Sequence, residues 1–156
     1  MKLFLAYIIL AYLAAAMQGL FFHGIKPDLI LVLVCFYSTM DRQTHYAAYG
    51  ALTGLILDVA SGFIIGPNVL SKVIAAFLAR KVRDNLFQWN IIIITFMIAI
   101  LSVVDIVVTD AVLETFTKMS FVNRSWSISI MGTVYTGISA VLLYLLFNRT
   151  KFRLLA

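Results

Sequence analysis

Charged residues and cysteine are both scarce in this sequence of 156 residues. Asp, Glu, Lys and Arg together make up 12% of it, against about 25% in a typical soluble domain. Cys35 is the only cysteine, so neither an intrachain disulfide nor a metal site built from several cysteines can form. The sequence also lacks a glycine-rich phosphate loop, a zinc motif and a serine-hydrolase motif. These features exclude a soluble enzyme, a disulfide-stabilised extracellular protein and a disordered tail.

Apolar residues dominate instead, at 63% of the chain. They form six segments, at about 3–22, 29–40, 46–63, 69–82, 90–116 and 126–147. None of the segments alternates apolar and polar residues as a membrane β-strand would. We therefore predict an all-α integral membrane protein, a single polytopic domain over residues 1–156 with six transmembrane helices. The second and fourth segments are short, and they are either steep spans in the protein interior or partly re-entrant pieces.

The basic residues predict the orientation of these helices. With six spans and a cytoplasmic start, eight basic residues fall on the inner side: Lys2, Arg42, Arg80, Lys81, Arg83, Arg149, Lys151 and Arg153. Four fall on the outer side: Lys26, Lys72, Lys118 and Arg124. This excess agrees with the positive-inside rule, so we expect both termini in the cytoplasm. The net charge of +5 does not indicate a nucleic-acid partner, because the basic residues lie between apolar segments.

A stripe of small residues marks the third segment. Gly50, Gly54, Asp58, Gly62 and Gly66 are each four residues apart, and such positions share one face of a helix. Small residues allow the backbone of another helix to approach closely in a membrane, so the stripe predicts helix packing within this chain. For Gly62 and Gly66 turn geometry is an alternative, because both flank a loop. Asn68 follows Pro67 and is predicted to cap the next helix.

Ionisable residues within the spans form a second pattern. From the predicted topology, one polar layer in the outer half of the membrane contains Asp28, Asp58, Lys72, Asp105, Asp110 and Glu114. One interpretation is internal neutralisation, in which Lys72 pairs with Asp58 or Asp105 and Asp28 caps its helix. The other is a cavity or docking site that opens outward. No nucleophile and base are arranged for catalysis, and His23 and His45 lie on opposite sides of the predicted membrane, so we expect no enzyme activity, metal or cofactor.

Two stretches carry a recognisable pattern, KPDLILVLVCFYSTM at residues 26–40 and YGALTGLILDVASGFIIGPNVL at residues 49–70. Both resemble the MreD family of bacterial rod-shape-determining proteins. The resemblance implies a non-enzymatic subunit of the cell-wall elongation machinery that binds MreC directly. It also implies a multi-pass protein of the bacterial cytoplasmic (inner) membrane. It also implies membership of one complex with MreB, RodA and a class B penicillin-binding protein. The family is similar in fold to the substrate-binding subunits of energy-coupling-factor vitamin transporters, which leaves such a binding subunit as the alternative function.

Overall fold

The computed structural model describes residues 2–21, 27–39, 45–62, 64–85, 91–117 and 126–153. Within these ranges the chain forms six α-helices: α1 (Lys2–Phe21), α2 (Leu29–Ser38), α3 (Tyr46–Ser61), α4 (Pro67–Asn85), α5 (Ile91–Thr117) and α6 (Trp126–Arg153). Each predicted apolar segment coincides with one helix, so the all-α prediction is confirmed. His23, Lys26, Arg42, Lys118 and Arg124, which entered the orientation and metal arguments, lie outside the described residues.

The helices differ in their ability to cross a bilayer. Among the described residues, only α5 contains a stretch that is both long and apolar enough, the 24 residues Ile92–Thr115. The 10 residues of α2 rise about 15 Å, which is half of the ~30 Å hydrocarbon thickness. The fourth helix is longer than expected, with 19 residues, but its last two turns carry the charged residues of the basic cluster. The number of spans and the cytoplasmic location of both termini therefore stay predictions.

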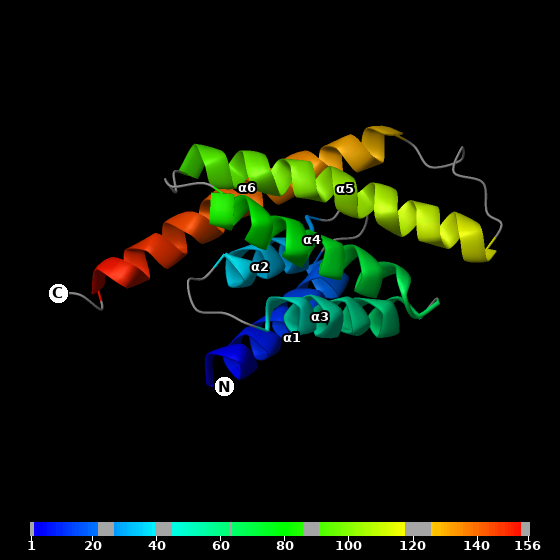
Figure 1. Ribbon diagram of the computed structural model, residues 1–156, viewed down its shortest axis with the longest axis horizontal. Coiled ribbons are helices and arrows are strands. Elements are labelled where there is room, and N and C mark those ends of the chain that lie inside the picture. Colours follow the sequence, from blue (N-terminus) through cyan, green and yellow to red (C-terminus); the bar gives the residue numbers. More distant parts are fainter. Residues whose placement is uncertain are drawn as a thin grey trace.

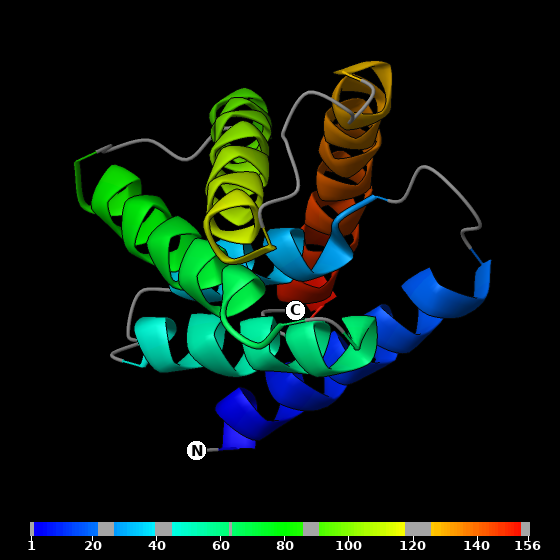
Figure 2. The same cartoon turned by 90° about the vertical axis from the view of Figure 1, so that its right-hand side faces the viewer.

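The short helix α2 lies at the centre of the molecule. It contacts all five other helices, and eight of its 10 residues are buried. On one side of it lie α1 and α3, and on the other α5 and α6 (Figures 1 and 2). A helix that is apolar on all faces is expected in an interior position, which explains why α2 has no polar face. The interior position of α2 fits both alternatives, a steep span and a partly re-entrant piece, so the choice between them stays a prediction.

Successive helices alternate in direction along the long axis of the molecule (Figure 1). The start of α1 and the end of α6 consequently lie at the same end, together with the end of α4 and the start of α5 (Figure 1). The basic residues of α4 are thus at the end of the molecule where the chain begins. The Asp28 end of α2 and the loop between α3 and α4 lie towards the other end.

Candidate functional site

The carboxylate of Asp58 binds the start of the neighbouring helix α4. Its Oδ2 accepts hydrogen bonds from the backbone N–H groups of Gly66 (2.7 Å) and Val69 (3.3 Å). Its Oδ1 accepts from the backbone N–H (3.1 Å) and side-chain amide (2.8 Å) of Asn68. The first N–H groups of a helix have no partner within the helix and carry partial positive charge, so a carboxylate there is stabilising. Asp58 is 1% exposed, and this contact fixes the end of α3 against the start of α4.

Two glycines of the stripe bring α3 and α4 into backbone contact. A Cβ atom added at Gly54 would lie 2.5 Å from the carbonyl oxygen of Asn68 and from the Cα of Val69. One added at Gly50 would lie 2.7 Å from the carbonyl oxygen of Lys72. Any side chain at either position would therefore push the two helices apart. Gly50, Gly54 and Asp58 form one face that α4 covers.

The other two glycines of the stripe have a different role. Gly62 ends α3 with φ 68°, and Gly66 precedes α4 with φ 137°. An added Cβ would meet no atom within 4 Å at either position, so close packing does not require glycine there. Positive φ does, because side chains disfavour this backbone region. In the stripe, Gly50 and Gly54 thus allow helix packing, whereas Gly62 and Gly66 allow the turn between α3 and α4.

Asn68 also differs from its prediction. The helix begins at Pro67, so Asn68 lies inside the first turn and not at the capping position. The capping groups come from Asp58, ten residues earlier in the chain, and Asn68 adds its side-chain amide as a further donor to that carboxylate. Proline suits the first helical position because its missing N–H would have no partner there.

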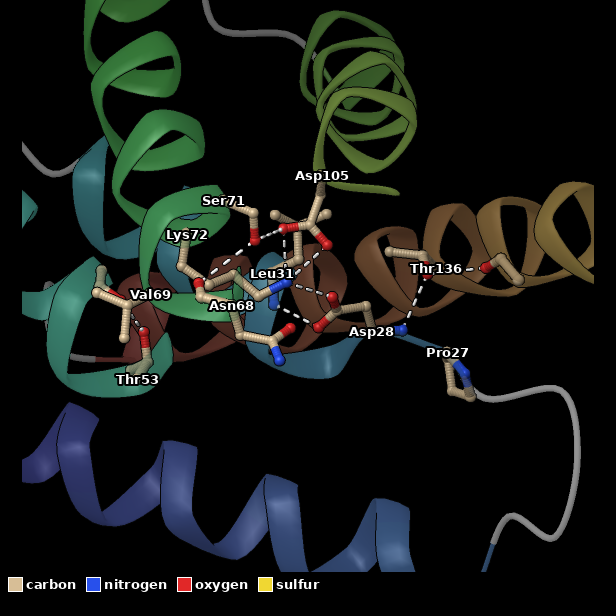
Figure 3. Close-up of polar contacts among 12 residues, drawn as sticks. Pro27, Asp28, Leu31, Thr53, Asn68, Val69, Ser71, Lys72, Asp105 and Thr136 are labelled. Atoms are coloured by element: carbon tan, nitrogen blue, oxygen red, sulfur yellow. Dashed lines mark hydrogen bonds and ion pairs between the residues drawn. The ribbon is translucent and has the colours of Figure 1, made fainter. Parts of the chain in front are cut away.

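A second polar group, the Lys72 cluster, joins four helices and consists of Asp28, Ser71, Lys72, Asp105 and Thr136 (Figure 3). The ammonium of Lys72 lies 2.8 Å from both carboxylate oxygens of Asp105 and 2.6 Å from Oδ2 of Asp28. The hydroxyl of Ser71 donates to Asp105 Oδ1 (2.7 Å). The backbone N–H of Asp28 donates to the hydroxyl of Thr136 (2.9 Å), which itself donates to the carbonyl of Gly132 (2.8 Å). Ser71, Lys72, Asp105 and Thr136 are buried and the side chain of Asp28 is 26% exposed, so most of the cluster lies in the interior of the helix bundle.

The carboxylates of this region are bound by groups of the protein itself. Lys72 neutralises Asp105, because its ammonium contacts both carboxylate oxygens of Asp105. Asp28 lies at the start of α2, where its Oδ1 accepts the N–H of Leu31 (2.8 Å). The carboxylate of Asp58 in α3 contacts the start of α4, so each of these two carboxylates meets the positive end of a helix dipole. This arrangement agrees with the interpretation of internal neutralisation. Lys72 pairs with both Asp28 and Asp105. Asp58 does not pair with Lys72 and instead binds the start of α4.

The last two members of the predicted layer lie apart from the Lys72 cluster along α5. Asp110 and Glu114 follow Asp105 by five and nine residues, which is about 7 and 13 Å along the axis. Asp110 is half-buried and Glu114 is exposed. The six ionisable residues therefore comprise the Asp58 contact, the Lys72 cluster and a more exposed pair at the end of α5.

Three polar residues of this region were not predicted as site residues. Ser71 and Thr136 belong to the Lys72 cluster, and the side-chain amide of Gln18 donates to the carbonyl of Pro27 at the approach to α2. Hydroxyl and amide groups carry no charge, so they do not stand out from an apolar sequence as Lys72 does. Within the described residues, no group of three or more His, Cys, Asp or Glu side chains could hold a metal ion.

Comparison with known proteins gives one finding. A family model described as rod shape-determining protein MreD matches residues 1–150. This match covers nearly the whole chain, including all residues of the Asp58 contact and the Lys72 cluster. No curated protein and no solved structure matches the chain significantly.

Proposed function

The chain belongs to the MreD family of rod shape-determining proteins, and on this premise we propose that it is a non-enzymatic scaffold subunit of the complex that elongates the bacterial cell wall. It is a membrane protein with a role in rod shape determination. In the proposal it crosses the cytoplasmic membrane several times and binds MreC directly. MreB, RodA and a class B penicillin-binding protein belong to the same complex and take part in peptidoglycan synthesis. The family match over residues 1–150 carries the proposal.

The distribution of polar groups supports a scaffold. Charged residues of the Lys72 cluster are turned inward and bound to one another, whereas large apolar side chains are exposed on the outer helices. Examples are Ile9 on α1 (61% exposed), Phe96 on α5 (68%) and Ile130 on α6 (62%). Such a surface suits lipid and the apolar helices of other membrane proteins. The internal hydrogen bonds would keep the helices in one arrangement while partners bind outside.

The same observation weighs against the vitamin-binding alternative. A ligand pocket needs convergent polar groups that are available to the ligand. The carboxylates of Asp28, Asp58 and Asp105 instead accept hydrogen bonds from the protein itself. We therefore favour the scaffold over a transporter subunit.

Co-purification tests the proposal. The full chain and tagged MreC from the same organism would be extracted together in a mild detergent, with an unrelated single-span protein carrying the same tag as the control. We expect the chain to be retained by MreC and not by the control. Loss of retention for a chain that is still helical and monodisperse would contradict the scaffold proposal. Stabilisation by a vitamin, of about 2.7 kcal/mol at a hundredfold excess over its dissociation constant, would favour the alternative.

A further inference from the structure

A groove between α4 and α5 is lined by apolar side chains only. Its volume is about 350 Å³, and its lining includes Leu78 and Val82 of α4 and Ile92, Phe96, Met97 and Ile100 of α5. Ile92 and Phe96 are among the most exposed large apolar side chains, at 72% and 68%. The groove is open along its side, so it faces whatever surrounds the two helices.

The extent of the groove matches one leaflet of a bilayer. Its lining on α5 runs from Ile92 to Leu101, which is about 13 Å along the helix axis. Half of the hydrocarbon thickness is about 15 Å. One acyl chain of a lipid extends over one leaflet, so the groove matches such a chain in length.

The part of α4 that lines this groove also carries basic residues. The groove lies where α4 ends and α5 begins, at the end of the molecule where the chain starts (Figure 1). Between Arg80 and Asn85 there are three basic residues and one acidic residue. Arg80 pairs with Asp84 (3.2 Å), and Arg83 donates to the carbonyl of Thr39 (2.6 Å). Lys81 is exposed and lies between the groove residues Leu78 and Val82 in the sequence.

We propose that the α4–α5 groove binds an acyl chain of an anionic phospholipid, whose phosphate is held by Lys81 at the cytoplasmic surface. The proposal uses the predicted orientation of the helices and does not depend on MreC binding. A long lysine side chain can cover an apolar surface with its methylene groups and reach the headgroup with its ammonium. Each Lys or Arg near an anionic membrane surface contributes about 1 kcal/mol, which corresponds to about fivefold in affinity.

Quenching of tryptophan fluorescence by brominated lipids tests the site. The chain has two tryptophans, and Trp89 lies in sequence between the end of α4 and the start of α5. A Trp126→Phe protein would be reconstituted in phosphatidylcholine vesicles containing increasing fractions of brominated phosphatidylglycerol or brominated phosphatidylcholine. We expect phosphatidylglycerol to quench Trp89 with at least fivefold higher relative affinity, and high salt to reduce the difference.

Matched variants separate the site from general membrane contact. Lys81→Gln should lower the preference for phosphatidylglycerol about fivefold, whereas Lys118→Gln, on the predicted outer side, should leave it unchanged. Val82→Phe should reduce quenching by both lipids because it fills the groove, and Val59→Phe on α3 is its control. Equal quenching by the two lipids, or an unchanged preference in Lys81→Gln, would overturn the proposal even if Val82→Phe does not fold.

Discussion

The contact between α3 and α4 can be tested with a single methyl group. Gly54→Ala places a Cβ 2.5 Å from two backbone positions of α4, at Asn68 and Val69. An ordinary contact needs at least 3.4 Å, so the two helices must separate by roughly an ångström at this point. Backbone atoms cannot rotate away as a flexible side chain can. We therefore expect the upper part of the range for overpacking, about 3 kcal/mol.

The helix propensity of alanine opposes this loss. Alanine is favoured over glycine by about 1 kcal/mol in a helix interior, which leaves a net loss of about 2 kcal/mol for Gly54→Ala. Gly137→Ala is the matched control, because an added Cβ there meets no atom within 4 Å in α6. This control should keep the propensity gain alone, so the two variants should differ by about 3 kcal/mol.

Reversible unfolding in mixed micelles, with increasing SDS and helicity followed by circular dichroism, measures the difference. Gly54→Ala should unfold at a lower SDS fraction than the parent protein, and Gly137→Ala at an equal or higher fraction. If the two variants unfolded at the same SDS fraction, α3 and α4 would not be in backbone contact, and the packing role of Gly54 would be refuted.

Three further predictions use the same assay. Asp58→Ala should destabilise the protein by about 2–4 kcal/mol, because three backbone N–H groups lose their acceptor. Asp58→Asn should cost less because its amide oxygen still accepts hydrogen bonds. Equal stability of both variants and the parent protein would show the side chain to be dispensable. Lys72→Met should cost about 3 kcal/mol because it leaves the buried carboxylate of Asp105 beside the partly exposed carboxylate of Asp28 without a cation, and adding Asp105→Asn should recover part of this loss. Additive effects of these two changes would contradict the ion pair. Thr136→Val should cost about 1 kcal/mol through the lost acceptor for the Asp28 N–H, and no change would place Thr136 outside the Lys72 cluster.

The helices were predictable because their signal is local. Long apolar segments, bounded by charged or glycine-containing turns, determine α1, α3, α5 and α6 without knowledge of their neighbours. The position of α2 is a tertiary property. Its continuous apolar sequence excludes a polar face, but only the contacts with the other five helices show that it lies at the centre.

The residues that form the polar contacts were predictable from the sequence, but the partner of each residue was not. Charge makes Asp28, Lys72 and Asp105 conspicuous in an apolar chain, and the alternating topology placed them at a similar height. Which carboxylate reaches Lys72 depends on the rotation of each helix about its axis, and periodicity gives little information on rotation when a helix is apolar on most faces. The same limitation hid the contact of Asp58 with the start of α4, since it requires the direction of the loop at Gly62 and Gly66.

The fourth helix links the two polar groups of the molecule. One face of α4 lies against the glycines of α3, where its backbone at Lys72 opposes Gly50. From the same residue, the side chain extends to Asp28 of α2 and Asp105 of α5. A displacement of α4 away from α3 would therefore also move the ammonium of Lys72 relative to both carboxylates. Because helices in lipid gain little from the hydrophobic effect, backbone contact and buried polar contacts are the forces available to hold them. Polar contacts of the Lys72 cluster join α2, α4, α5 and α6, and close backbone contact joins α3 to α4. Both kinds of contact meet at α4, so a change that displaces this helix would disturb the whole polar interior.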